Sequence, residues 1–211
     1  MPGFLSTVQS YIKVILAAGR IQEERDAQTK QIEYLERYMI ASLRAHVIVN
    51  TIKSCNLLFK HLTGTPLFRE DIEVVNGLHV PCQNEKDFLV KLGGLKTLFE
   101  VDLDPIRLKL KDFKKDWKLL KLMEQWFCEN HLAYDKNMFQ TWRNIIDLRD
   151  ASFPYHPTDT RIVDLLRSFG QSLPVQYAKL YDSILDKFLE SLNLLQIALN
   201  AAVYKTKPEE K

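Results

Sequence analysis

The segment of this chain that best combines reactive side chains runs from Asp147 to Pro157. Arg149 stands at the expected end of one helix and His156 precedes the expected start of the next, while Pro154 and Pro157 stiffen the link between them. A guanidinium group stabilises negative charge on a phosphate, and an imidazole that titrates near neutral pH transfers protons to or from a ribose hydroxyl. We therefore expect this pair to be suited to cleaving RNA without a metal ion, with the 2′-OH as the internal nucleophile.

The pattern resembles the diagnostic motif of the HEPN superfamily, a group of all-α bundles. That motif is an Arg, often followed by a polar residue, and then a His after four to six intervening positions; Arg149, Asp150 and His156, after six residues, match it here. The resemblance implies a metal-independent endoribonuclease of a toxin-antitoxin or phage-defence system. In it, Arg149 would stabilise the phosphate charge, His156 would act as general acid or base, and Asp150 would orient Arg149 or position the substrate. The resemblance also implies a homodimer with a composite site, and an antitoxin or other protein as a further partner.

Other interpretations of the same residues stay open. Arg149 and Asp150 would also cap the C-terminal end of a helix, and His156 would then only close a rigid loop. The chain would in that case be a non-catalytic helical module that binds a protein partner through a long helix of residues 22–62. A third alternative is a HEPN-like frame that binds nucleotides or RNA without cutting it.

A basic segment offers a surface for RNA. Seven basic and two acidic residues between Arg107 and Lys121 give this segment a net charge of +5, although the whole chain carries only +2. At helical spacings of four, three, four and three, one stripe would hold Arg107, Lys111, Lys114, Lys118 and Lys121. We expect this stripe to attract RNA phosphates, with binding that weakens as salt rises. The alternative is a solvated helix face whose lysine stems cover apolar surface.

Two short pairs resemble metal-ligand spacing. His79 with Cys82, and Cys128 with His131, would together supply four ligands of a tetrahedral zinc site. The order of the ligands is unusual, and the simpler interpretation is small buried cysteines and surface histidines. We therefore predict no metal and no cofactor, and the chain also lacks a Gly-rich phosphate loop and an H-E-x-x-H motif.

The elements that position these residues are expected to be helices. Gly and Pro together make up 15 of the 211 residues, which is few for a chain rich in turns. Apolar residues recur at helical spacing, and the sequence predicts an all-α bundle of about five or six helices, HEPN-like in frame. The expected helices cover residues 4–16, 22–62, 105–130, 135–149, 159–169 and 174–199, with a break at Gly19 and a helix end at Gly170.

Residues 65–104 are expected to form an irregular insert. Asn76-Gly77 stands between two β-branched stretches, which predicts a small β-hairpin near residues 72–81. A short helix over 85–92 and a break at Gly93-Gly94 would complete the insert. Residues 1–204 would thus form a single helical domain, followed by a disordered tail of residues 205–211.

The remaining features concern location. Three cysteines, an odd number without a framework spacing, indicate a reducing compartment. The N-terminal residues lack the basic region of a signal peptide, and the most apolar later segment contains too many polar residues for a membrane span. We expect a cytoplasmic protein with no membrane partner.

Overall fold

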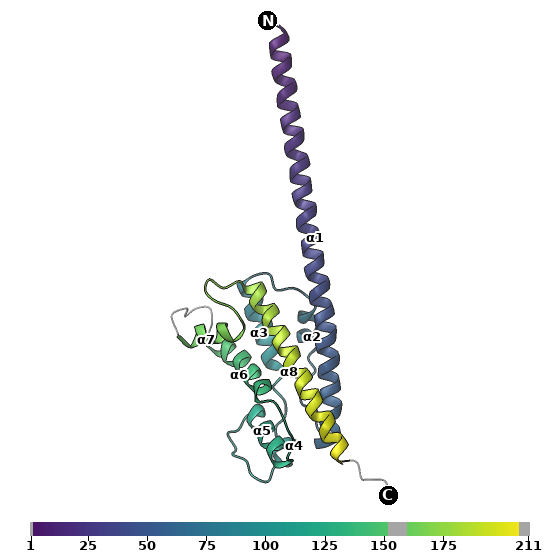
Figure 1. Ribbon diagram of the computed structural model, residues 1–211, viewed down its shortest axis with the longest axis vertical. Helices are drawn as coiled ribbons and strands as arrows, with labels where there is room; N and C mark the ends of the chain where they lie inside the picture. Colours follow the sequence, from purple (N-terminus) through teal and green to yellow (C-terminus); the bar gives the residue numbers. More distant parts are fainter. Residues whose placement is uncertain (1, 152–159, 207–211) are drawn as a thin grey trace. The chain divides into compact units, whose positions relative to one another are not determined.

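The computed structural model describes residues 2–151 and 160–206, and all regular secondary structure within them is helical. The all-α prediction is confirmed, with more helices than expected among these residues (Figure 1). The eight helices are α1 (Pro2–Thr63), α2 (Ile72–Leu78), α3 (Glu85–Thr97), α4 (Asp104–Arg107), α5 (Leu119–Glu129), α6 (Lys136–Asp150), α7 (Thr160–Ser168) and α8 (Tyr177–Thr206).

The prediction of a β-hairpin near residues 72–81 is wrong, because α2 occupies most of that segment. Asp71 caps the helix: its side chain accepts hydrogen bonds from the backbone N–H groups of Glu73 and Val74, at 3.0 and 3.4 Å. Two donors that a helix start would leave unsatisfied are thereby paired. Asn76 and Gly77 fall in the last turn of α2 and not at a hairpin turn.

Two other expected boundaries are also wrong. Gly93 and Gly94 lie inside α3, which continues to Thr97, and Gly19 lies inside α1, which is one continuous helix. A Cβ on Gly94 would lie 3.4 Å from the Cγ2 of Val74, so Gly94 faces α2 at ordinary contact distance. Glycine lowers helix propensity by about 1 kcal/mol relative to alanine, and packing readily offsets that amount.

The expected helix over 105–130 is interrupted. Only α4 and α5 are helical there, and residues 108–118 connect them as an irregular loop. The helices predicted over 135–149, 159–169 and 174–199 correspond to α6, α7 and α8. Gly170 adopts a φ of +70° just beyond α7, and the N–H of Gln171 donates to the carbonyl of Leu166, as expected for a glycine that ends a helix.

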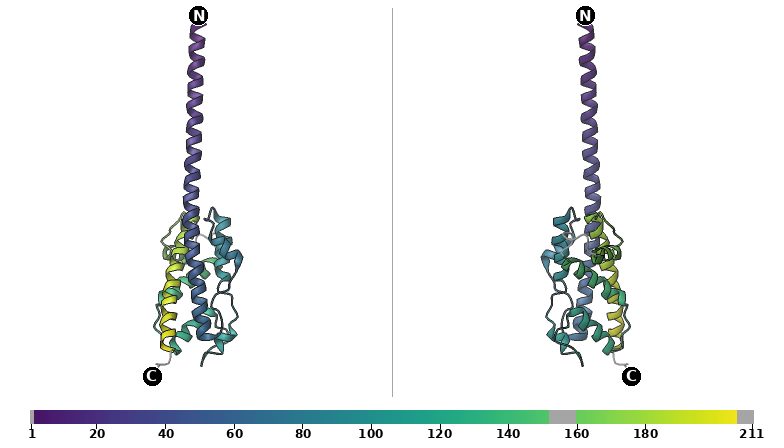
Figure 2. Two further views of the ribbon diagram at one scale, coloured as in Figure 1. Left: turned by 90° about the vertical axis from the view of Figure 1, so that its right-hand side faces the viewer. Right: turned by 90° about the vertical axis from the view of Figure 1, so that its left-hand side faces the viewer.

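The chain divides into two units, Met1–Ile40 and Ala41–Lys211. In the larger unit, α8 packs against α6 and α3, and residues 41–63 of α1 run beside α8 in the same direction (Figures 1 and 2). Arg44 forms ion pairs with Asp182 at 2.7 Å and Asp186 at 2.9 Å. Farther along the two helices, the side chain of Gln196 donates to the hydroxyl of Ser54 at 2.7 Å.

A single apolar core fills the larger unit. Its centre is aromatic, and the ring of Trp142 in α6 contacts those of Phe68, Phe99 and Phe139 at centroid distances of 5.5 to 5.6 Å. The indole N–H of Trp142 donates to the hydroxyl of Ser191 in α8 at 2.6 Å, so the polar atom of this buried ring is paired. This packing fixes the position of α6, whose C-terminal end carries Arg149.

None of the described helices has both the length and the apolarity that crossing a bilayer requires. Cys55, Cys82 and Cys128, all within the described residues, form no disulfide.

Candidate functional site

The C-terminal end of α6 gathers charged side chains from two helices. Asp150 Oδ1 accepts a hydrogen bond from Lys96 Nζ of α3 at 2.9 Å and one from Arg149 Nη1 at 3.2 Å. The Arg149 side chain is 51% exposed, and the Lys96 side chain 28%. The structure therefore places Arg149 and Asp150 together at the surface, and it adds Lys96, which the sequence analysis did not include.

The positive charges at the C-terminal end of α6 favour the ionised form of Asp150. The hydrogen bond from Lys96, together with the charges of Lys96 and Arg149, lowers the pKa of Asp150 below its usual value. One turn earlier, Asp147 pairs with Arg161 of α7 at 3.3 Å. Three cations and two carboxylates leave these five side chains with a net charge of +1. Cations at a helix C-terminus also compensate the negative end of its dipole, so the cluster has a structural role as well.

His156, the third residue of the predicted ribonuclease motif, lies outside the described residues. The site described here is therefore the Lys96, Arg149 and Asp150 cluster alone. It offers a guanidinium group held by a neighbouring carboxylate and half open to solvent, which is an arrangement able to bind a phosphate.

The basic segment does not form the predicted helical stripe. Lys111 and Lys114 lie in the irregular loop, Lys118 is the N-cap residue of α5, and all three are exposed. Lys121, inside α5, forms an ion pair with Glu124 at 3.6 Å. The lysines are available to anions, but they are not aligned on one helix face.

Arg107 holds this loop in place. Its guanidinium pairs with Asp104 at 2.8 Å and donates to the carbonyls of Lys115 at 3.1 Å and Trp117 at 3.4 Å. At the other end of α5, the carboxylate of Glu129 accepts from the backbone N–H of Lys111 at 2.8 Å, and this bond contributes most to the lowered pKa of Glu129. Arg107 was predicted to contact nucleic acid, and the structure gives it these loop contacts.

The residues of the hypothetical zinc site have other contacts. His79 Nδ1 lies 3.2 Å from the hydroxyl of Ser42, and burial raises the pKa of the Cys82 thiol to about 11, which disfavours a thiolate ligand. His131 follows the end of α5 with a φ of 51°. Within the described part of the chain, no three His, Cys, Asp or Glu side chains gather in a way that would hold a metal ion.

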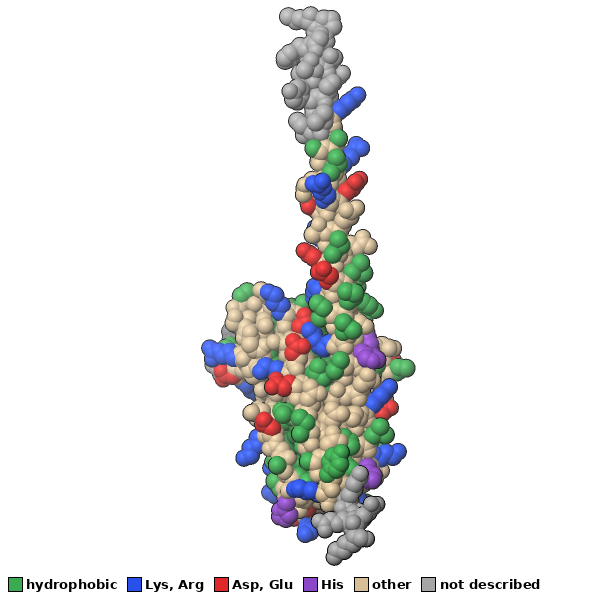
Figure 3. Space-filling view, turned by 45° about the vertical axis from the view of Figure 1, so that its right-hand side comes forward, with side chains coloured by type: hydrophobic (Ala, Val, Ile, Leu, Met, Phe, Trp, Pro, Cys, Tyr) green, Lys and Arg blue, Asp and Glu red, His purple; other side chains and the backbone are tan. Residues whose placement is uncertain are grey.

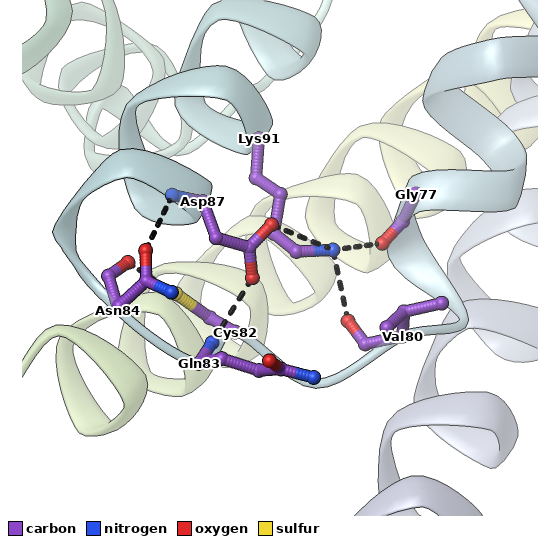
Figure 4. Close-up of polar contacts among 7 residues, drawn as sticks. All are labelled: Gly77, Val80, Cys82, Gln83, Asn84, Asp87 and Lys91. Carbon is purple, nitrogen blue, oxygen red and sulfur yellow. Dashed lines mark hydrogen bonds and ion pairs between the residues drawn. The ribbon is translucent and has the colours of Figure 1, made fainter.

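Lys91 is a buried cation that the sequence analysis did not single out. Its ammonium group donates to the carbonyls of Gly77 at 2.6 Å and Val80 at 3.0 Å, and lies 3.9 Å from the carboxylate of Asp87 (Figure 4). The ammonium also lies 5.6 Å from the ring centre of Tyr181. Lys91 thus ties the end of α2 to α3, which is a structural role.

The smaller unit presents a different kind of surface. Every residue from 17 to 40 is exposed, and apolar side chains lie among the charged ones along this part of α1 (Figure 3). The large apolar side chains are 40 to 61% exposed: Ile21, Ile32, Tyr34, Leu35, Tyr38, Met39 and Ile40. An isolated helix is only marginally stable in water, because most helical stability comes from packing an apolar face. This segment is a candidate interaction surface.

Sequence periodicity indicated this surface but not the polar contacts of the larger unit. The apolar register through Ile32, Leu35 and Met39 is visible in the sequence. Lys91 and Lys96 look like any other exposed lysine of α3, because their partners lie 11 to 54 residues away. Comparisons of this chain with protein-family models, with curated proteins and with solved structures found no match.

Proposed function

We propose that this protein is a helical interaction protein that binds another α-helix through residues 17–40. One observation carries the proposal: all residues of this segment are exposed, including Ile32, Leu35 and Met39 at spacings of three and four. A helix with an apolar stripe at these spacings is a typical partner in a coiled coil or in a helix groove. Exposed apolar surface of this kind marks a protein interaction site more often than an isolated exposed residue does.

The proposal is tested by site-specific photo-crosslinking in cells that express the full chain. A benzophenone amino acid at Leu35 should give a cross-linked species, whereas the same group at Lys30, on the opposite side of the helix, should give little. Mass spectrometry then identifies the cross-linked peptide. Equal yields at the two positions, or none at either, would refute the proposal.

A second candidate function, a metal-independent endoribonuclease of a defence or toxin-antitoxin system, is favoured by the cluster at the end of α6. Arg149 is half exposed beside Asp150 and near Lys96, so a guanidinium is available to a phosphodiester. In this proposal Arg149 stabilises the phosphate charge, His156 transfers the proton and Asp150 orients Arg149. RNA would also contact the exposed Lys111, Lys114 and Lys118.

Incubation of the pure protein with mixed RNA in EDTA tests this second candidate. Cleavage by the wild type should fall at least about 100-fold in His156→Ala, the size typical of a lost general acid or base. Cleavage that persists undiminished in that variant would refute the role of His156. If the wild type does not cleave RNA, the ribonuclease proposal is wrong and the proposed helix-binding function remains.

A further inference from the structure

The exposed segment of α1 follows a heptad register. In this register the a and d positions form one stripe along the helix. Five of its seven residues are apolar, and the two polar ones lie at its centre. The a positions are Ala18, Arg25, Ile32 and Met39, and the d positions are Ile21, Gln28 and Leu35. The two polar residues, Arg25 and Gln28, are neighbours in the middle, and they restrict which partner fits.

A parallel, in-register pair of two copies fits poorly. It would place Arg25 of one copy against Arg25 of the other in the same core layer, and two like charges in contact are destabilising. Gln28 would meet Gln28 in the next layer. The two polar layers would thus be adjacent, and neither would bring opposite charges together.

An antiparallel pair fits the same residues well. When residues whose numbers sum to 53 face each other, Ile21 lies opposite Ile32 of the second copy, and Ala18 lies opposite its Leu35. Arg25 then lies level with Gln28 of the second copy, whose amide oxygen accepts a hydrogen bond, and one turn from its Glu24. Each of these three pairs occurs twice in a two-fold dimer, so the register produces four apolar layers around two polar ones.

We propose that residues 18–35 bind the same segment of a second copy as an antiparallel coiled coil, with Ile21 opposite Ile32. The inference rests on the proposed interaction function and names its partner. The interface is isologous, so a closed dimer results and no open polymer grows from it. From residue 18 to residue 35 the paired segment is about 27 Å long at 1.5 Å per residue.

The first test is the mass of the full-length protein in solution, measured by light scattering during size exclusion. The chain of 24.7 kDa should elute as a species of 2 × 24.7 = 49.4 kDa. Leu35→Asp should halve that mass, whereas Lys30→Asp, which places the same charge on the opposite side of the helix, should leave it unchanged. A monomeric wild type, or a dimer that Leu35→Asp leaves intact, would overturn the proposal.

The second test determines the direction of the helices by disulfide formation in a Cys128→Ser background, which removes the exposed native thiol. A mixture of the Ile21→Cys and Ile32→Cys proteins should form a disulfide-linked heterodimer under mild oxidation. Neither protein alone should cross-link, and a mixture of Ile21→Cys with Met39→Cys should not. Cross-linking of Ile21→Cys with itself would indicate a parallel pair and overturn the proposed register.

The two proposals fail in different ways. If the wild type is monomeric but the benzophenone at Leu35 captures a different protein, the second-copy inference is wrong and the interaction function stands. If the wild type is monomeric and Leu35 cross-links to nothing, both are wrong.

Discussion

At the scale of single residues, His131 has the backbone conformation that suits its side chain least. Among the described residues other than glycine it alone has a positive φ, 51°. The N–H of His131 donates to the carbonyl of Cys128, and the N–H of Leu132 donates to that of Phe127, so the α5 end has the same hydrogen-bond pattern as the α7 end at Gly170. His131 is therefore a helix-ending residue at a position that favours glycine.

We expect His131→Gly to raise the free energy of unfolding by about 0.5–1 kcal/mol. The left-handed conformation costs about 1–2 kcal/mol for a residue with a Cβ, and the greater freedom of glycine in the unfolded chain offsets part of the gain. Urea denaturation followed by circular dichroism measures the change. Gly170→Ala is the matched control and should lower the same quantity by about 1 kcal/mol. A destabilised His131→Gly would contradict the assignment.

Lys91→Met tests the buried ammonium group. The variant keeps most of the apolar volume but removes the hydrogen bonds to the carbonyls of Gly77 and Val80, and each lost bond costs about 0.5–1.5 kcal/mol. Chemical denaturation should show a corresponding loss, whereas Lys86→Met on an exposed position of α3 should stay within about 0.5 kcal/mol of wild type. Equal effects of the two variants would argue against a structural role for Lys91.

Asp150 predicts a dependence of stability on pH. Its pKa is lowered in the folded protein, chiefly by the hydrogen bond from Lys96, so its contribution is complete above the pKa of an unfolded Asp, about 3.9, and is lost as the pH falls through the lower folded pKa. Asp150→Asn should cost about 0.2–1 kcal/mol at pH 7, the range for surface pairs, and less near pH 2. Denaturant titrations of both proteins at the two pH values measure this difference. A difference that did not depend on pH would exclude ionic stabilisation.

At the scale of elements, the sequence predicts α6, α7 and α8 correctly and fails where helix boundaries depend on contacts with other elements. The helices α6, α7 and α8 have strong apolar periodicity, which is a local property of the chain. The Asn76-Gly77 pair is compatible both with a hairpin turn and with the last turn of a helix. The side chains of Asp71 and Lys91 contribute to the second, through a cap and through bonds to Gly77 and Val80. The bonds from Lys91 depend on contact between α2 and α3, and the periodicity of the sequence does not reveal that contact.

The prediction of a helical basic stripe over residues 107–121 is wrong for a related reason. Charges at helical spacing predict one stripe, but Arg107 bonds to the carbonyls of Lys115 and Trp117 and so holds the chain in a loop. The spacing of Arg107 and the lysines records a helical register that the chain does not adopt. Of the predicted ribonuclease motif, Arg149 and Asp150 were placed correctly at a helix end, and their link to Lys96 required the packing of α3 against α6.

The glycine pair of α3 provides a test at this scale. Gly93→Ala should stabilise the protein by about 0.5–1 kcal/mol, because alanine favours a helix and an added Cβ meets no atom within 4 Å. Gly94→Ala should gain less, because its Cβ would lie 3.4 Å from Val74 Cγ2, at the short end of ordinary contact distances, and any adjustment of Val74 offsets part of the gain. Thermal unfolding of the two variants gives the comparison. A larger gain for Gly94→Ala would mean that α2 moves away without cost.

At the scale of the whole molecule, the two units differ in what stabilises them. Residues 41–151 and 160–206 contain the aromatic core and the ion pairs named above, whereas residues 17–40 are exposed along their whole length. Most helical stability in proteins comes from packing an apolar face, so we expect partner binding to raise the order of this segment. The sequence alone indicated a partner for a long helix, but it did not separate the segment that packs on α8 from the segment that stays exposed.

This dependence predicts that hydrogen exchange in residues 17–40 varies with protein concentration. Diluting the protein below the dissociation constant of the dimer should make amides of this segment exchange faster, because the separated helix opens more often. Amides of α6 and α8 should exchange at the same rate throughout. The Leu35→Asp variant should show fast exchange in the segment at every concentration, and Lys30→Asp should behave as wild type. Slow exchange in residues 17–40 that is independent of concentration in both wild type and Leu35→Asp would mean that the helix is stable by itself and does not need a second copy.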